Sequence, residues 1–464
     1  MDNRIPPGLL IAAPSSGSGK TSITLALLRR FRQLKRSVAS IKVGPDYIDP
    51  AFHAAASGQA CTSLDSWAMR ESSVMQLLET AGERAEFVLG EGVMGLFDGA
   101  PDGRGSTADL ALMTGWPVVL VIDARGMAAS AAAILHGFKT FDPRVSIAGV
   151  IFNRVGSDRH AAMLAKACGP LDVPLLGMVR NASHLQLPSR HLGLIQANEH
   201  EALESFLEAA ACDIAGEIDC DRLAVSASAR LCKERGGGVS GASRSRQPGL
   251  KPFGQRIAVA RDTAFAFSYP FLLDAWRTAG AEISLFSPLA DEAPDLTADA
   301  VYLPGGYPEL HAGRLAGNRS FMTGLEESAR RGACVYGECG GYMVLGEGLT
   351  DAQGVRHAMA GLLPLETSFA PEKTGKPGRR MVLGYRQAAL LQDTAIGMAG
   401  EGFRGHEFHY ARELSVDEPT TPVRAVRPGD RLFGLKDAQG QDLADAGLVR
   451  GNVMGSFLHI IDTV

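Results

Sequence analysis

The sequence predicts an α/β protein with two doubly wound domains, each a sheet with helices on both faces. From residue 8 to about 230, short apolar runs alternate with amphipathic stretches, and the alternation starts again at residue 257. Runs that are apolar on both sides and separated by helices are typical of parallel strands covered on both faces. In residues 233–253, Gly, Ser, Arg and Pro replace the apolar periodicity and predict a linker. We therefore expect domains at 1–232 and 254–464.

The individual elements follow from the positions of the apolar runs. In the first half, strands are expected at residues 9–12, 38–41, 87–89, 118–122 and 149–152. A helix is expected over residues 20–34, where helical spacing puts five apolar residues on one face: Ile23, Leu27, Leu28, Phe31 and Leu34. In the second half, strands are expected at residues 257–260, 301–303, 333–336 and 455–459.

Composition and charge limit the classes of protein that fit. The 464 residues are 45% hydrophobic and 21% charged, as in ordinary globular proteins. The net charge of −5, from 46 basic and 51 acidic residues, gives no basic footprint for nucleic acid. Seven irregularly spaced cysteines predict reduced thiols and a cytoplasmic location. Because no run approaches the ~18 apolar residues of a membrane helix, we expect no membrane partner.

A loop rich in glycine and serine joins the first predicted strand to the first predicted helix. Residues 12–21 read Ala-Ala-Pro-Ser-Ser-Gly-Ser-Gly-Lys-Thr. Such a loop presents backbone N–H groups to a phosphate, while Lys20 reaches the terminal phosphates and the Thr21 hydroxyl binds Mg²⁺. Pro14 stands where the common pattern has Gly, and a helix-capping turn is the alternative interpretation. The residues expected to bind ATP are Ser16, Gly17, Ser18, Gly19, Lys20 and Thr21.

Polar side chains follow three further predicted strands. Asp46 and Asp49 come after the second strand, and Glu91 comes after the third. Because parallel strands end at one edge of a sheet, these acids would face the same crevice as the phosphate loop. Thr21, Asp46 and Glu91 are the expected Mg²⁺ ligands, although a solvated strand-end acid or an Asp turn is the alternative. Asn153 ends a later strand, where its amide suits the edge of a nucleotide base.

A second reactive signature lies in the C-terminal half. Residues 337–341, Gly-Glu-Cys-Gly-Gly, follow a predicted strand and precede a helical run. Small residues on both sides permit the strained turn of a nucleophile elbow at Cys339, and the helix dipole is expected to lower the thiol pKa. The N–H groups of Gly306 and Gly340 are expected to form an oxyanion hole. Cys334, inside the strand, is expected to be a core residue.

The base that activates Cys339 must come from elsewhere in the chain. His459, at the end of the strand predicted over 455–459, is our choice. His406 and His409 compete for the role, and their spacing also suits a metal, a substrate or a domain contact. The cysteine and histidine predict release of ammonia from L-glutamine. Together with an ATP site, this predicts that a carboxylate is converted to an amide.

At these residues the chain resembles the cobyrinic acid a,c-diamide synthases, a family that includes the hydrogenobyrinic acid a,c-diamide synthases. The resemblance runs essentially from end to end and rests on residues 16–21, 42–50, 64–67, 91–99, 190–194, 303–309 and 337–343. It implies an N-terminal P-loop parallel-sheet domain like dethiobiotin synthetase and a C-terminal class I glutamine amidotransferase domain of flavodoxin-like fold. It implies ATP- and glutamine-dependent amidation of the a and c side chains of a corrinoid in cobalamin biosynthesis.

The resemblance also implies roles for single residues. Cys339 is carried over as the nucleophile and His459 as its activator. Most relatives of this amidotransferase class have a Glu two residues after that His, where this chain has Ile461. Many cobyrinate-type enzymes lack this Glu as well, which implies a dyad and leaves Asp462 open as an orienting residue.

Substrate contacts and the identity of the ring are further expectations. Lys42, Asp49 and Asp98 are the expected substrate contacts, and Arg379 and Arg380 of a basic loop are further candidates. The stretch Gly-Pro-Asp-Tyr-Ile-Asp-Pro favours the a and c positions over the other carboxylates that cobyric acid synthases amidate. The style of the sequence, rich in alanine and arginine, favours metal-free hydrogenobyrinate over cobyrinate.

A rival from another class is a partitioning-type switch ATPase with an inert amidotransferase-like domain. That class has a second lysine early in its loop, where this chain has Ser15. The presence of both Cys339 and His459 also disfavours it. The sequence does not determine the oligomeric state, and a homodimer is one of the assemblies it allows.

Overall fold

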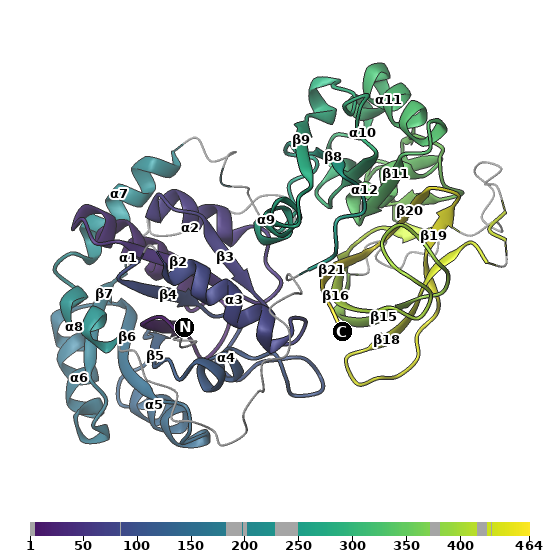
Figure 1. The fold of residues 1–464 in the computed structure, drawn as a ribbon. Coiled ribbons are helices and arrows are strands. Elements are labelled where there is room, and N and C mark those ends of the chain that lie inside the picture. Colours follow the sequence, from purple (N-terminus) through teal and green to yellow (C-terminus); the bar gives the residue numbers. More distant parts are fainter. Residues whose placement is uncertain are drawn as a thin grey trace. The chain divides into compact units, whose positions relative to one another are not determined.

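The computed structural model describes residues 5–83, 85–181, 197, 202–227, 249–371, 381–414, 425–427 and 429–464. The chain divides into two compact units (Figure 1). The first contains Met1–Trp67 and Glu71–Arg244, and the second contains Ala68–Arg70 and Ser245–Val464. The predicted linker falls mainly outside the described residues, so the predicted domain boundaries stay predictions. In the described part of the chain, no helix is long and apolar enough to cross a membrane.

The first unit is built on one seven-stranded parallel sheet with the order β3-β2-β4-β1-β5-β6-β7. Its strands are β1 (Gly8–Ala12), β2 (Val38–Val43), β3 (Cys61–Leu64), β4 (Phe87–Glu91), β5 (Val118–Asp123), β6 (Ile147–Val155) and β7 (Leu175–Arg180). Its helices are α1 (Lys20–Gln33), α2 (Asp49–Ser57), α3 (Glu71–Gly82), α4 (Thr107–Thr114), α5 (Ser130–Phe141), α6 (Asp158–Cys168), α7 (Leu203–Ile214) and α8 (Cys220–Ser226). Every residue of β1, β2 and β4 is buried, as the prediction of strands covered on both faces requires.

Helix α1 forms where its apolar spacing predicts. Four of the five predicted face residues are buried, namely Ile23, Leu27, Leu28 and Phe31. The fifth, Leu34, is the C-cap residue and is 42% exposed. The helix ends there because Lys35 has φ of 57°, in the left-handed region.

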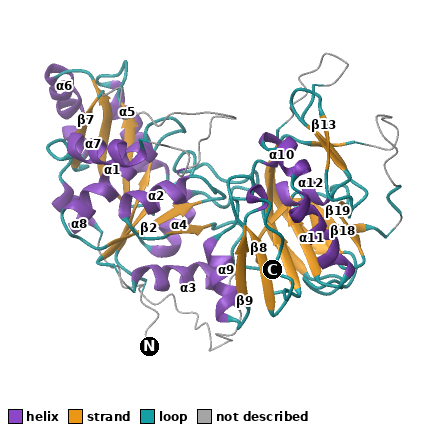
Figure 2. Cartoon of the chain, turned by 90° about the horizontal axis from the view of Figure 1, so that it is seen from above, coloured by secondary structure: helices purple, strands orange, loops and turns teal. Residues whose placement is uncertain are grey.

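The second unit holds a ten-stranded sheet, β21-β16-β15-β18-β19-β20-β11-β10-β8-β9, and a four-stranded sheet, β13-β12-β14-β17. The strands are β8 (Arg256–Ala260), β9 (Glu282–Phe286), β10 (Ala300–Leu303), β11 (Cys334–Glu338), β12 (Gly348–Thr350), β13 (Arg356–Ala358), β14 (Glu366–Ser368), β15 (Val382–Leu390), β16 (Gly402–His409), β17 (Arg412–Glu413), β18 (Arg431–Asp437), β19 (Ala446–Arg450), β20 (Val453–Ser456) and β21 (Leu458–Thr463). The helices are α9 (Pro270–Thr278), α10 (Ala312–Gly317), α11 (Arg319–Arg330) and α12 (Gly340–Leu345). Figure 2 shows helices flanking the strands within each unit.

The α/β class is confirmed in both units, but only half of the large second sheet is parallel. Strands β9, β8, β10, β11 and β20 pair in parallel. The rest of the sheet, from β19 to β21, is antiparallel. Sequence periodicity did not predict this half because a strand such as β15 is mostly half-exposed and carries no continuous apolar run.

Candidate active sites

The phosphate loop joins β1 to α1 and takes its shape from its own residues and from β6. Gly17 and Gly19 have φ of 80° and 89°, in the left-handed region that favours glycine. The Ser18 hydroxyl donates to the Ser15 carbonyl at 2.9 Å, and Asn153 Nδ2 donates to the Ser18 carbonyl at 3.0 Å. Asn153 therefore braces the loop, and its predicted contact with a nucleotide base stays a prediction.

We expect Gly19→Ala to weaken ATP binding far more than Gly17→Ala. An added Cβ at Gly19 would lie 2.1 Å from Asn153 Nδ2, whereas at Gly17 it would meet nothing within 4 Å. Both variants carry the left-handed backbone cost of about 1–2 kcal/mol, so their difference isolates the displacement of the loop. An ATP titration should give a KM at least about tenfold higher for Gly19→Ala. Equal KM values would show that Asn153 moves without disturbing the loop.

Lys20 and Asp98 both contact the loop that follows β4. Lys20 Nζ donates to the Met94 carbonyl at 2.5 Å. Burial lowers the pKa of Lys20, although the carboxylate of Glu91 opposes the shift. Asp98 Oδ2 accepts from the N–H of Gly95 at 2.9 Å and so closes a turn in the same loop. The loop therefore links the predicted phosphate lysine to one of the predicted substrate contacts.

A cluster of charges surrounds Lys42 where β2 and the neighbouring β4 end. Lys42 Nζ lies 2.5 Å from Asp49, 2.8 Å from Glu91 and 3.7 Å from Asp46. Burial alone would lower the pKa of Lys42, but these carboxylates raise it well above its usual value. Thr21 Oγ1 donates to Glu91 Oε1 at 2.6 Å. The structure thus brings together the residues that the sequence assigned to the metal and two of those assigned to the substrate.

The two carboxylate oxygens of Asp46 make different contacts in this cluster. Its Oδ1 accepts from the N–H groups of Ile48 at 2.8 Å and Asp49 at 2.9 Å, which is the turn that the sequence offered as an alternative. Its other oxygen faces Lys42. Burial and the negative charge of Asp46 raise the pKa of Asp49.

His53, in α2, belongs to the cluster but was not singled out from the sequence. Its Nε2 lies 2.7 Å from Glu91 Oε2, and its Nδ1 lies 3.6 Å from Cys61 Sγ. Burial alone would lower the pKa of His53, but Cys61 and Glu91 raise it to about 10. Burial would likewise raise the pKa of Glu91, yet Lys42 and His53 hold it far below its usual range. In the sequence, the position of His53 one helical turn after Asp49 was the signal that could have placed it in this cluster.

The residues present fit a magnesium ion that is bound together with nucleotide phosphates. Mg²⁺ prefers oxygen ligands and is commonly held by one or two carboxylates and the phosphates of a substrate. Thr21 and Glu91 offer a hydroxyl and a carboxylate oxygen 2.6 Å apart. Among the described residues, no group of three or more His, Cys, Asp or Glu could hold a metal ion. Phosphate oxygens would therefore have to complete the predicted site.

In the second unit, the cysteine elbow joins β11 to α12. Cys339 has φ of 48° and ψ of −105°, a strained conformation for a residue other than glycine. Its N–H donates to the Ser456 carbonyl of β20 at 2.8 Å. An added Cβ at Gly341 would lie 2.0 Å from the Leu303 carbonyl oxygen, so the close approach requires glycine. A strand, a strained turn and a helix are the geometry of a nucleophile elbow.

The Cys339 thiol has a raised pKa, which reverses the sequence expectation. Burial raises it well above the usual value, Glu309 adds to the effect, and the N–H of Gly340 opposes it. Helix α12 has only six residues and Cys339 is 3% exposed, so desolvation outweighs the helix dipole. The thiolate therefore has to be generated by proton transfer to a base.

His459, in β21, lies beside Cys339. An added Cβ at Gly305 would lie 3.3 Å from Cys339 Cβ and 3.3 Å from His459 Nε2, so both residues border Gly305. The His459 ring stacks on His406 with 5.0 Å between centroids and 9° between planes. Burial, and then the adjacent His406, lower the pKa of His459 well below its usual value. A neutral imidazole next to the thiol can accept its proton.

The two competing histidines have other neighbours. His406 packs on His459, and its Nε2 lies 3.4 Å from the hydroxyl of Tyr269. His409 stacks on Phe457 with 3.8 Å between ring centroids. These contacts place His406 against His459 and His409 against Phe457, and His459 remains our choice as the base.

The two amides of the predicted oxyanion hole lie close together. An added Cβ at Gly340 would lie 3.1 Å from the nitrogen of Gly306. At Gly306 an added Cβ would lie 2.1 Å from the Ala264 carbonyl oxygen, so this position also requires glycine. Both backbone amides therefore lie near Cys339.

Asp462, left open as an orienting residue, is bound elsewhere. Its carboxylate is fully buried and accepts from the Arg70 guanidinium at 2.8 Å and from the backbone N–H groups of Arg70, Gly249 and Thr463 at 3.0, 3.1 and 2.9 Å. These bonds hold the Ala68–Arg70 segment within the second unit. The carboxylate of Asp462 is therefore bound to Arg70, inside the second unit.

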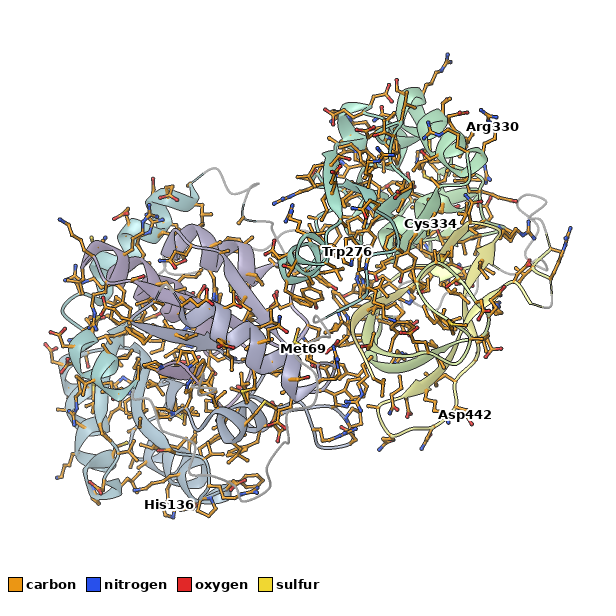
Figure 3. The ribbon with its side chains drawn as sticks, in the orientation of Figure 1. Met69, His136, Trp276, Arg330, Cys334 and Asp442 are labelled. Carbon is orange, nitrogen blue, oxygen red and sulfur yellow. The ribbon has the colours of Figure 1, made fainter. Side chains whose placement is uncertain are left out.

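Cys334 is a core residue, as the sequence suggested. Figure 3 places it inside the second unit, whereas Arg330 and Asp442 lie at the outside. Burial raises the pKa of Cys334 to about 12. The residue therefore serves as a matched control for Cys339. The predicted stretches at 190–194 and 373–380, with Arg379 and Arg380, lie outside the described residues.

Glu338, which precedes Cys339, makes the stability of the second unit depend on pH. Burial raises the pKa of Glu338 from 4.5 to about 7. Between these pH values the folded chain binds more protons than the unfolded chain, so stability falls as pH rises. Glu338→Gln removes this penalty, and its free energy of unfolding relative to wild type should rise by up to about 3 kcal/mol from pH 4.5 to 8. Urea unfolding at both pH values measures the difference, and a pH-independent difference would contradict the raised pKa.

Comparison with known proteins agrees with the two domains. Residues 9–195 match the CobQ/CobB/MinD/ParA nucleotide binding domain, and residues 256–463 match the CobB/CobQ-like glutamine amidotransferase domain. The chain thus combines a nucleotide-binding domain with a glutamine amidotransferase domain, as its fold and sites indicate.

Proteins named hydrogenobyrinate a,c-diamide synthase are similar over nearly the whole chain. The protein of Brucella abortus biovar 1 (strain 9-941) is 52% identical over 456 residues, covering 98% of each chain. That of Sinorhizobium sp is 50% identical, with 98% of each chain covered. That of Rhodobacter capsulatus is 49% identical and covers 98% of this chain and 99% of the relative. The chain belongs to the hydrogenobyrinate a,c-diamide synthase family, which confirms the resemblance seen in the sequence.

Proposed function

We propose that the chain catalyses ATP- and glutamine-dependent amidation of the a and c carboxylates of hydrogenobyrinate, with cobyrinate as the alternative ring. One observation carries the proposal. A chain 52% identical to a hydrogenobyrinate a,c-diamide synthase over 98% of its length has both a phosphate loop and a Cys339–His459 pair. The reaction takes place in the cytoplasm and involves no nucleic acid and no membrane.

The second unit supplies ammonia. The Cys339 thiol gives its proton to His459 as the sulfur attacks the carboxamide carbon of glutamine. The N–H groups of Gly306 and Gly340 stabilise the oxyanion, and His459 returns the proton to the departing ammonia. Water then cleaves the thioester and releases glutamate.

The first unit activates the carboxylate of the ring. A ring carboxylate attacks the γ-phosphate of ATP and forms an acyl phosphate and ADP, and ammonia then displaces phosphate to leave the amide. Residues 16–21 hold the nucleotide phosphates, with Lys20 leaving Met94 to reach them. Thr21 and Glu91 would hold Mg²⁺, which neutralises phosphate charge, while Lys42, Asp49 and Asp98 contact the substrate.

The path of the carboxylate oxygen tests this chemistry. With ring carboxylates labelled with ¹⁸O, the phosphate released from ATP should carry one ¹⁸O for each amide formed. Unlabelled phosphate would contradict the acyl phosphate. Hydrogenobyrinate and cobyrinate supplied separately should both be tried, and a higher kcat/KM for hydrogenobyrinate is expected. A higher kcat/KM for cobyrinate would make cobyrinate the preferred substrate and would leave the proposed chemistry unchanged.

A further inference from the structure

The imidazole of His459 has to be oriented, and Asp462, left open for this role, has its carboxylate bound to other groups. At the position where most relatives have Glu, Ile461 is apolar and buried. The pairing of β21 with β16 passes from Ile460 to Asp462, so Ile461 is the extra residue of a β-bulge. The carboxylate of Asp462 binds Arg70. An acid on another element is therefore the candidate.

Glu338, at the end of β11, places a carboxylate near His459. Its Oε2 lies 3.9 Å from His459 Nδ1. The same oxygen accepts from the hydroxyl of Tyr302 at 2.8 Å, and Oε1 accepts from the hydroxyl of Tyr336 at 3.1 Å. Oε1 also accepts from the N–H of Ile460 at 3.2 Å. Three donors therefore fix the carboxylate, and one of them is the peptide N–H that follows His459.

We propose that Glu338 is the acid that positions His459, so that the residue before the nucleophile takes the place of the Glu that Ile461 replaces. Glu338 selects the tautomer with a proton on Nδ1, which leaves Nε2 to take the proton of Cys339. When the imidazolium forms, the ionised carboxylate stabilises it without accepting its proton. The separation of 3.9 Å is longer than a hydrogen bond, and catalytic contacts commonly shorten when substrate binds.

The contacts of Glu338 allow an orienting function toward His459 to be distinguished from a purely structural function. The three donors to Glu338 do not need a negative charge. The neutral side chain of glutamine has the same shape as that of Glu and can hydrogen-bond to Tyr302, Tyr336 and the N–H of Ile460. His459 needs a negative charge. A structural residue would therefore tolerate Gln better than the shorter Asp, whereas an orienting acid would tolerate Asp better than Gln.

The test compares Glu338→Gln and Glu338→Asp in the full chain, with Glu282→Gln as a control on the exposed strand β9. Glutamine hydrolysis is measured with ATP and hydrogenobyrinate present. We expect the kcat order wild type, Asp, Gln, with a loss of at least about tenfold for Gln and an unchanged KM for glutamine. For Gln, amidation from ammonium chloride should remain near the wild-type value, and the melting temperature at neutral pH should not fall below that of wild type. The control should match wild type in all measurements.

The outcomes distinguish this inference from the proposed function on which it rests. Wild-type kcat in Glu338→Gln, or a lower kcat for Asp than for Gln, would overturn the inference alone. A parallel loss of ammonia-dependent amidation and melting temperature in both variants would also overturn it, because the residue would then be structural. If the wild-type chain hydrolyses no glutamine, the proposed function falls and this inference falls with it.

Discussion

Cys339→Ser is expected to abolish amidation from glutamine and to leave amidation from ammonia intact. The hydroxyl is a much weaker nucleophile than the thiolate that His459 generates, so glutamine hydrolysis should fall by at least about 1,000-fold. Ammonium chloride bypasses this step, because ATP and the ring carboxylate react in the first unit. The rate of amide formation from each nitrogen source is the measurement.

Cys334→Ser is the matched control because Cys334 begins β11, the strand that leads to Cys339, and is buried in the core. It should lower stability by about 1–3 kcal/mol through a buried hydroxyl and leave the rate with glutamine near that of wild type. A Cys339→Ser variant that still used glutamine would disprove the assignment of the nucleophile. Loss with both nitrogen sources would show that the substitution disturbs more than the thiol.

Glu91→Gln is expected to abolish amidation from either nitrogen source while glutamine hydrolysis continues at its basal rate. Glu91 is fully buried and contacts Thr21, Lys42 and His53. Removing its charge would deprive Mg²⁺ of a carboxylate and take one negative charge away from the buried side chains of Lys42 and His53. The rate should fall by at least about 100-fold, and the free energy of unfolding by about 3–5 kcal/mol. Amide formation and urea unfolding measure the two effects.

Glu86→Gln provides the control for Glu91 in the first unit. Glu86 makes an exposed ion pair with Arg36 at 2.8 Å, and such pairs contribute at most about 1 kcal/mol. Its amidation rate should equal that of wild type. If Glu91→Gln still formed the amide from ammonia, the assignment of Glu91 to the nucleotide site would be wrong.

The two reactive turns could be predicted from the sequence because their requirements are local. A loop that needs left-handed φ at Gly17 and Gly19, or close approach at Gly341, restricts residue types over a few positions. Most of the parallel strands could be predicted for a similar reason, since burial on both faces produces continuous apolar runs. The parallel strands β3, β7 and β9, which are only partly buried, were not predicted.

Features that depend on contacts between distant segments could not be predicted. The pKa of Cys339 is set by burial beneath other elements, which a helix rule does not include. His53 meets Glu91, and Glu338 approaches His459, only after strands far apart in the chain have paired. In the antiparallel half of the second sheet, strands such as β15 and β16 were missed because they are partly exposed.

Transfer of the glutamine amide nitrogen to the ring tests the central claim most directly. The purified chain would be incubated with hydrogenobyrinate, ATP, Mg²⁺ and glutamine labelled with ¹⁵N in its amide, and the products weighed by mass spectrometry. The account predicts a diamide that carries ¹⁵N at both the a and c positions. An unmodified ring, in a preparation that still hydrolyses glutamine and ATP, would contradict it.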